Sequence, residues 1–314
     1  MPHADTVLTG GSHREAGGGV PADRAPGIAK ISVIVLTFNE GVNLEDCLGS
    51  VRDLALEIFV VDSGSTDNTL AIASRFGAKI FSHPFESHSR QWDWALRNLP
   101  IRGEWVLGLD ADQRLTPELA GEMRSIGGEA YREVDGIYLN RRQIFRGKWI
   151  RFGGYYPKYL LKLFRPAAVF TDENDLVDHH FHVRGTVAKL KHDILEANLK
   201  EDDLSFWIEK HSRYAKRLAL EEFRRRRGER PDMIRASLAG NPDERTLQIK
   251  RMWGHMPLYL RPFLYFFYRY FLRLGFLDGK QGAIFHFMHA FWYRLLIDIH
   301  LDDMLGAAKT GEQK

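Results

Sequence analysis

Cysteine is scarce in this sequence, and no long apolar run opens it. Cys47 is the single cysteine among 314 residues, so a disulfide within the chain and a zinc site built from several thiolates are both excluded. A chain without disulfides is typical of a reducing compartment. Residues 1–29 contain no continuous apolar stretch of seven residues, so we expect no secretory signal and predict a cytoplasmic location.

Residues 1–29 also lack aromatic side chains and contain six glycines and three prolines. Such a segment cannot bury enough apolar surface to offset the entropy lost on ordering, so we expect a disordered tail there. The remaining chain is long enough for one large or two modest domains. We predict a first domain over 30–200 and a helical extension over 201–314. The net charge of +3 does not by itself favour a nucleic acid partner.

From residue 31 onward, short β-branched runs alternate with segments of helical spacing. Strands are expected at 31–37, 57–62, 79–83 and 104–110, and helices at 43–53, 68–76, 89–98 and 117–126. This alternation predicts an α/β fold with a mainly parallel, Rossmann-like sheet. Ligands of such sheets bind beyond the carboxyl ends of the strands, so the residues that follow each strand are the first candidates for a site.

Acidic residues follow three of these strands. Glu40 comes after the first, Asp62 ends the second, and Asp110 and Asp112 end the fourth. Two carboxylates at i and i+2 suit a divalent cation whose coordination a diphosphate completes. Helix capping explains any one of these acids equally well, but it does not explain so many along one sheet edge. Neither G-x-x-x-x-G-K-[ST] nor G-x-G-x-x-G is present, which disfavours the usual nucleoside triphosphate and dinucleotide sites.

The segments ISVIVLTFNE, VVDSGSTDNT and WVLGLDADQ together resemble the nucleotide-sugar-binding half of the family-2 inverting glycosyltransferases, which have the GT-A fold. The resemblance implies a nucleoside diphosphate sugar donor and a Mg²⁺ or Mn²⁺ ion held by the Asp112 of a DxD motif. It also implies donor-binding roles for Thr37, Asn39, Glu40, Asp62, Ser63, Gly64 and Asp110. The family often has Glu where this chain has Gln113, and Gln-Lys-Asn where it has Gln91-Trp92-Asp93. Arg90 is the candidate to replace the phosphate contact of that lysine.

Between Arg141 and Arg165 lie eight basic residues and no acid, interleaved with aromatic residues. Such a segment can pack on sugar rings, form a single-strand nucleic acid platform or remain a solvated loop. GKWIRFGGYYPKYLLKLFR also resembles the acceptor side of glycosyltransferases that extend lipopolysaccharide core or lipid-linked glycans. That resemblance implies acceptor-binding roles for Trp149, Gly153, Gly154, Tyr155 and Tyr156, with no nucleic acid partner.

Inverting transfer requires a base that takes the proton of the attacking hydroxyl. The segment 172–180 supplies several candidates. We favour Asp178, with His179 orienting it or serving instead, while Asp175 and Glu173 stay open. No His-x-x-x-His pair with a third ligand is evident, which disfavours a zinc site.

Residues 256–275 are rich in aromatic side chains but are interrupted by Arg261, Arg269 and Arg273, so they do not form a transmembrane helix. On one continuous helix the three arginines fall within about 120°. This pattern favours peripheral attachment to an anionic membrane surface, and packing against the protein core is the alternative. Residues 283–299 are the expected partner segment.

These features predict metal-dependent, inverting transfer of a hexose to a saccharide or lipid-linked acceptor in the biosynthesis of a bacterial envelope glycan, such as lipopolysaccharide core or exopolysaccharide. The reaction is expected at the inner face of the cell membrane. A non-catalytic sugar- or polyanion-binding module with the same fold is the alternative.

Overall fold

Four parallel strands begin the fold where the sequence predicts them. The computed structural model describes residues 29–172, 180–229 and 234–311, so the tail expected over 1–29 lies outside it except for Ala29. The strands are β1 (Ile31–Thr37), β2 (Ala55–Asp62), β3 (Lys79–Ser82) and β4 (Trp105–Asp110), and they lie in the order β3-β2-β1-β4. The residues of β1 and β4 are almost all buried, on both faces of the sheet, as expected for central parallel strands.

Helices cover both faces of this half of the sheet. They are α1 (Leu44–Val51), α2 (Thr69–Arg75), α3 (His88–Asn98) and α4 (Pro117–Arg124). Helix α1 buries Leu44, Cys47, Leu48 and Val51, the same residues whose spacing predicts the helix. Side-chain caps fix two helix starts, because Ser87 accepts a hydrogen bond from the backbone of α3 and Thr116 accepts one from α4.

The second half of the sheet is mixed. It contains β5 (Gln113–Leu115), β6 (Gly136–Phe145), β7 (Lys148–Ile150), β8 (Tyr159–Phe164) and β11 (Val187–Glu196), and it continues from β4 in the order β8-β6-β11-β5. Strand β8 is antiparallel to β4 and β6, whereas β6 and β11 are parallel. A separate hairpin pairs β9 (Val169–Thr171) with β10 (Phe181–Val183). The whole is an α/β fold with a mainly parallel sheet and C-terminal helices.

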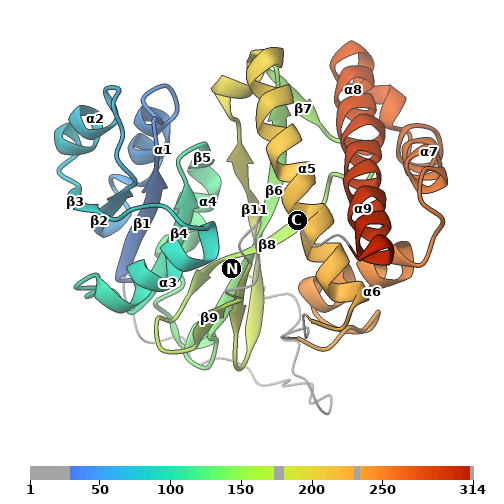
Figure 1. Cartoon of the computed structure of the whole chain (residues 1–314). Coiled ribbons are helices and arrows are strands. Elements are labelled where there is room, and N and C mark those ends of the chain that lie inside the picture. Colours follow the sequence, from blue (N-terminus) through green and yellow to red (C-terminus); the bar gives the residue numbers. More distant parts are fainter. Residues whose placement is uncertain (1–28, 173–179, 230–233, 312–314) are drawn as a thin grey trace.

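In the described part of the chain, the α-helices that follow the sheet are α5 (Leu204–Arg226), α6 (Pro242–Gly254), α7 (Leu260–Phe267), α8 (Gly279–His286) and α9 (Tyr293–Thr310). Figure 1 shows α5 between the strands β6 and β11 and the helices α8 and α9. Helix α5 packs along α9, and a third core between them includes Trp207, Ala215, Phe285 and Leu301. None of the helices in the described ranges is long and apolar enough to cross a bilayer.

The segment 256–275 is not the continuous helix that its spacing suggests. Helix α7 ends at Phe267, a π-helical turn η3 (Tyr268–Leu272) follows, and Leu274 adopts a left-handed conformation before the 3₁₀ turn η4 (Gly275–Asp278). Arg261 is 3% exposed and bonds to Glu222 and Asp298. The prediction that the three arginines lie on one side of a continuous helix is therefore wrong, because the helix is interrupted and Arg261 bonds to the interior.

Arg269 also turns inward. Its Nη1 donates to the carbonyl oxygen of Gly153 at 2.9 Å, and its guanidinium lies 4.2 Å from the centre of the Tyr155 ring. Apolar side chains occupy the outside instead, each between 39% and 63% exposed. We call them the outer apolar patch: Leu260, Phe263, Leu264, Phe267, Tyr268, Phe271, Leu272, Leu274, Phe276, Leu277 and Phe287.

Candidate functional site

A cavity of about 840 Å³ lies beyond the carboxyl ends of β1 and β4. Residues at the ends of β1, β4 and β11 line it together with β8 and α3, and α5 contributes a further part of the wall. Six residues predicted from the strand-end motifs line this cavity: Thr37, Asn39, Glu40, Ser63, Asp110 and Asp112. The parallel order of β1 and β4 brings them together, as the fold class predicts.

The loop after β1 is held by polar contacts from the next strand-end loop. Asn39 has a φ of 53°, and its side-chain oxygen accepts from the backbone N–H of Thr66 at 2.8 Å. The backbone N–H of Asn39 donates to Ser65 Oγ at 2.8 Å. Glu40 accepts from Asn43 Nδ2 at 2.8 Å and pairs with Lys200 Nζ. The loop that faces the cavity is therefore fixed in one conformation by its own neighbours.

Asp62 is buried at the end of β2 and does not line the cavity. Its carboxylate accepts from Thr37 Oγ1 at 2.9 Å and from the backbone N–H groups of Gly64 and Ser65 at 2.9 and 2.8 Å. Gly64 takes a φ of 91°, which only glycine adopts without strain. In the structure, Asp62 therefore shapes the 62–65 turn, and the donor-binding roles of Asp62 and Gly64 stay predictions.

Helix α3 presents Gln91, not Arg90, to the cavity. The Gln91 side chain donates to Ser63 Oγ at 3.1 Å and to the carbonyl oxygen of His83 at 3.2 Å. Arg90 is exposed and pairs with Glu86 one turn earlier. The two neighbours lie on different sides of the helix, so this position does not support the phosphate contact predicted for Arg90.

Asp110 is paired inside the cavity. Lys162 Nζ on β8 donates to Asp110 Oδ2 at 2.9 Å, and the lysine side chain is only 5% exposed.

The structure gives a physical reason why this chain has Gln113 where the family often has Glu. Its amide donates to Glu196 Oε2 at 2.9 Å, and a glutamate at 113 would place like charges in contact there. Glu196 itself pairs with Arg141 at 2.8 Å.

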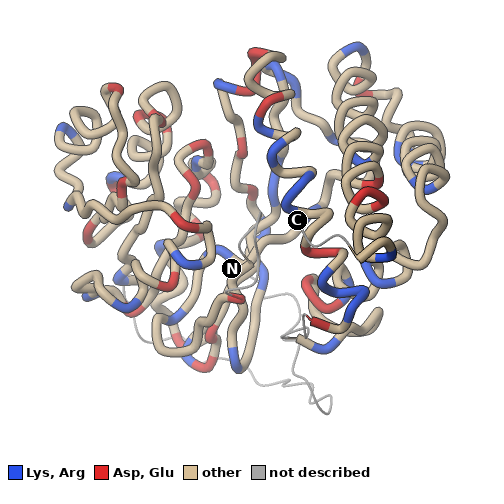
Figure 2. The backbone as a smooth tube through the Cα atoms, in the orientation of Figure 1, with Lys and Arg blue, Asp and Glu red and all other residues tan. Residues whose placement is uncertain are grey.

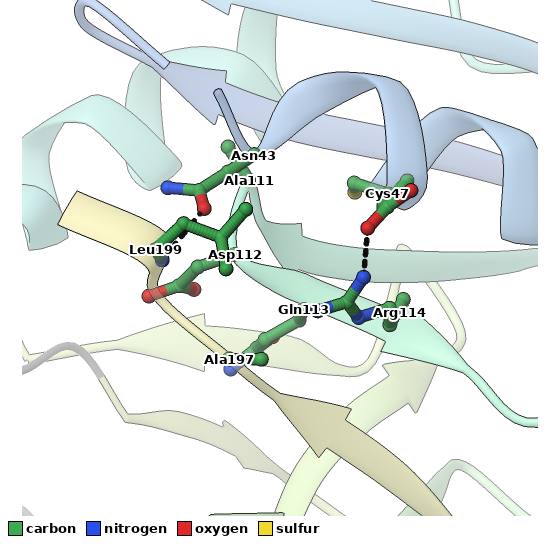
Figure 3. Close-up of a pocket in the computed structure, with 9 residues that line it drawn as sticks. Asn43, Cys47, Ala111, Asp112, Gln113, Arg114, Ala197 and Leu199 are labelled. Carbon is green, nitrogen blue, oxygen red and sulfur yellow. Dashed lines mark hydrogen bonds and ion pairs between the residues drawn. The ribbon is translucent and has the colours of Figure 1, made fainter. Parts of the chain in front are cut away.

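Across the described residues, Asp112 lacks the hydrogen-bond donors that Glu40, Asp110 and Glu196 have at the strand ends that line the cavity. Figure 3 shows it beside Asn43 and Leu199, which are joined to each other by a hydrogen bond of 3.0 Å. Its carboxylate accepts no hydrogen bond from any residue that the structure describes. Burial raises its pKa well above the usual range, and the neighbouring carboxylates of Glu196 and Asp110 raise it further. A cation would relieve this crowding of negative charge, so the donor set fits a divalent metal.

The expected acceptor loop lies against the C-terminal helices and not in the cavity. Gly153 donates to the carbonyl oxygen of Arg273 at 2.9 Å, and a Cβ at 153 would lie 1.9 Å from His286 Cε1. Gly154 also has a positive φ, and Tyr155 packs on the Phe285 ring. This close approach between loop and helix explains why glycine is required. Acceptor binding by Gly153, Gly154 and Tyr155 stays a prediction.

Trp149 and Tyr156 form a second group outside the cavity lining. Their rings meet edge to face with centroids 5.0 Å apart, and the Tyr156 hydroxyl lies 3.2 Å from the buried Asp193 carboxylate. The guanidinium of Arg142 lies 4.8 Å from the centre of the Trp149 ring. Acceptor binding by these two residues stays a prediction.

The candidate bases Asp175, Asp178 and His179 lie outside the described residues, as does Glu173. The next residues along the chain, His180 and Phe181, line the cavity.

Several further residues line the cavity, although neither the strand-end acids nor the implied donor-binding set includes them. Phe38 and Phe85 offer exposed rings, 55% and 42% accessible, to the cavity. Basic residues come from distant parts of the chain: Lys158, Lys162, Lys200, Lys210, Arg213 and Arg217. No pattern in the sequence pairs Lys200 with Glu40 across 160 positions. The helical repeat of cationic residues on α5 is the sequence signal that could have indicated this basic side of the cavity.

Comparison with known proteins gives a family match. The model of Glycosyl transferase family 2 matches residues 32–188, which is half of the chain and contains the strand-end motifs. An uncharacterized glycosyltransferase of Rickettsia bellii is 38% identical over 97 residues, covering 31% of this chain and 32% of that protein. The lipopolysaccharide core biosynthesis glycosyltransferase LpsC of Rhizobium meliloti is 31% identical over 94 residues, covering 28% and 34%. The chain thus matches about a third of the length of these curated relatives.

Solved structures resemble the chain more distantly. S. aureus TarS 1-349 covers 90% of this chain and 92% of its own, at 15% identity and a TM-score of 0.41. Glucosyl-3-phosphoglycerate synthase of Mycobacterium tuberculosis, solved with Mn²⁺, UDP and glucosyl-3-phosphoglycerate, covers 36% and 44% at 26% identity and a TM-score of 0.29.

Proposed function

Because this chain belongs to glycosyl transferase family 2, we propose that it transfers a hexose, with inversion, from a nucleoside diphosphate sugar to a saccharide or lipid-linked acceptor. The observation that carries the proposal is the Asp112 carboxylate, which has no hydrogen-bond donor among the described residues and lies in a cavity lined by three other strand-end acids. The match to LpsC supports an acceptor from a bacterial envelope glycan.

Asp112 would hold a Mg²⁺ or Mn²⁺ ion whose remaining ligands come from the donor diphosphate and water. Across residues 29–172, 180–229 and 234–311, no three His, Cys, Asp or Glu side chains cluster to hold a metal by themselves, which is consistent with a site that the substrate completes. When bound, the ion stabilises the negative charge of the leaving diphosphate. Lys162 holds Asp110 in place beside it.

The nucleoside end of the donor would lie along Thr37, Asn39, Glu40 and Ser63, with Phe38 and Phe85 as flat surfaces for the base. For the proton of the acceptor hydroxyl we retain Asp178, with His179 and Asp175 as the other candidates. Their place in the chain directly before the cavity residues His180 and Phe181 supports a base from this segment.

The test is protection from thermal unfolding by nucleotides. UDP and GDP, each with Mg²⁺ or Mn²⁺, are added to the protein and to two variants, Asp112→Asn and Asp53→Asn. Asp53 is an exposed control that pairs with Arg52 at the surface. We expect one nucleotide to raise the unfolding temperature of the wild type and the control with metal, and metal-dependent protection to disappear in Asp112→Asn. Absence of protection by either nucleotide with either metal would refute the proposal.

We also propose that the outer apolar patch contacts lipid at the inner face of the cell membrane. Its support is eleven exposed large apolar side chains on α7, η3, η4 and the turn after α8, which are elements that contact one another. Exposed apolar side chains gathered in this way mark interaction sites. Only Arg273 of the three arginines is exposed. Binding should therefore depend mainly on apolar contact and respond weakly to salt.

Vesicle sedimentation tests this proposal. The double variant Phe267→Ser/Phe271→Ser should lose most binding to phosphatidylglycerol-containing vesicles, whereas Ile249→Ser, an equally exposed apolar residue on α6, should bind like the wild type. Equal binding by all three proteins would contradict a role for the patch.

A further inference from the structure

Helix α5 has two functional faces. Trp207, His211, Ala215 and Ala219 repeat every four residues and are buried, most of them in the core shared with α9. A second face lines the cavity, and it consists of Phe206, Lys210, Arg213, Tyr214 and Arg217. Its spacing of four, three, one and three residues keeps these side chains on one side of the helix. Figure 2 shows Lys and Arg repeated along the length of α5.

The cations at the acidic end of the cavity are already paired. Lys162 pairs with Asp110, Lys200 with Glu40, Arg141 with Glu196, and Lys210 with Glu201. Lys210 also lies close enough to Asp112 to lower its pKa, against the raising effects of burial and the neighbouring acids. The proposed metal and donor diphosphate belong at this end, where these cations already have acidic partners.

Two arginines further along the same face, Arg213 and Arg217, have no buried acidic partner among the described residues to neutralise their charge. Arg217 forms no hydrogen bond or ion pair with any described residue. Within the described ranges Arg213 pairs with Glu209 alone, and because both side chains are more than half exposed, that pair contributes little. Arg217 lies two helical turns, about 10 Å along the axis, from Lys210. The cavity therefore has a second cationic position, separated from the carboxylate end.

We infer that the cavity-facing side of α5 binds an anionic group, a phosphate or a carboxylate, carried by the acceptor glycan. The inference rests on the proposed function, because it places donor and acceptor at opposite ends of one cavity. Arginine binds phosphate and carboxylate through paired N–H donors, which suits recognition of such a group. Tyr214 and Phe206, on the same face, supply rings that pack on a sugar.

The experiment measures binding of small acidic sugars to the protein already saturated with the nucleotide and metal that protect it. The probes are glucose 6-phosphate, glucuronate, inorganic phosphate and glucose. The variants are Arg217→Gln and, as a matched control, Lys216→Gln, which removes one positive charge from an exposed position next to it on α5. Titration calorimetry reports the sugar, and thermal protection reports the nucleotide separately.

We expect glucose 6-phosphate or glucuronate to bind the wild type more tightly than glucose, and the better of the two identifies the anion. Arg217→Gln should weaken that binding about tenfold, while Lys216→Gln stays within about twofold and nucleotide protection is unchanged in both. Inorganic phosphate binding as tightly as the sugar phosphate would show an anion site without sugar recognition and would overturn the inference. Equal binding by Arg217→Gln, no binding of either acidic sugar, or loss of nucleotide protection in Arg217→Gln would also overturn it. Absence of nucleotide protection in the wild type would instead refute the proposed function itself.

Discussion

Arg261 joins three helices through one buried ion cluster, and its removal gives a sharp test of how the C-terminal helices are held. Its Nε donates to Asp298 on α9 at 2.6 Å, and Nη1 and Nη2 donate to Glu222 on α5 at 2.8 and 3.1 Å. The Arg261 and Asp298 side chains are 4% and 1% exposed. We expect Arg261→Met to preserve much of the side-chain volume while leaving a carboxylate buried without its cation.

Removal of one partner of a buried ion pair costs about 3–5 kcal/mol. The lower part of that range applies here, because Glu222 keeps Arg226 at 2.7 Å and Asp298 keeps the backbone N–H of Tyr259 at 2.8 Å. We therefore expect Arg261→Met to lower the free energy of unfolding by about 3 kcal/mol at pH 7. The double variant Arg261→Met/Asp298→Leu should recover much of this loss, since no unpaired charge remains.

Urea unfolding followed by circular dichroism measures the change, with the exposed Arg273→Met as control. The loss should shrink at low pH. Burial alone would raise the pKa of Glu222, but bonds to Arg261 outweigh burial and hold it below its ordinary value of 4.5. The pair therefore stabilises the fold above that pH and loses its contribution as pH falls through the lowered pKa. A loss below about 1 kcal/mol at pH 7, or one that does not depend on pH, would refute this reasoning.

Three further predictions concern the first half of the chain and its contact with the helices. Burial would raise the pKa of Glu57, but bonds from Lys79, Arg102 and Ser32 lower it to about 2, so this carboxylate should contribute at most about 3 kcal/mol above pH 4.5. That contribution disappears as pH falls toward 2, and Glu57→Gln should flatten the pH dependence of urea unfolding. Gly153→Ala should cost more than about 2 kcal/mol, because φ is +69° and the new Cβ meets His286, while nucleotide protection persists in thermal shift. Asp62→Asn should cost about 1–3 kcal/mol by calorimetry, because an amide nitrogen cannot accept from the 62–65 turn. Unchanged stability in any of these variants would contradict the corresponding contact.

The sequence predicts β1 to β4 and α1 to α4 to within a few residues, because the strands are short β-branched apolar runs and the helices carry apolar residues at helical spacing. The gathering of Thr37, Glu40, Asp110 and Asp112 follows from strand order alone. Long-range pairs such as Asp110 with Lys162 could not be predicted, since no local pattern records which side chain will lie opposite another.

The arginines of 256–275 show a different limit. A helical wheel gives the angles between residues only if the helix is continuous, and it does not say which side faces the protein. Here a π-helical turn and a left-handed Leu274 break the period, and Asp298 together with Glu222 draws Arg261 inward. Arg261 and Arg269 have polar partners inside, and the apolar side chains of the outer apolar patch lie on the outside.

The two faces of α5 have a consequence for recombination among related chains. This 23-residue helix is about 34 Å long, and it supplies part of the cavity wall while it also anchors α9 and, through Glu222, α7. An exchange of coding sequence near residue 200 would therefore transfer the α5 wall and the outer apolar patch together, as one inherited unit. A chimera designed to change the cavity alone should graft only the residues of the cavity-facing side onto the resident helix, and should leave the side that packs on α9 untouched.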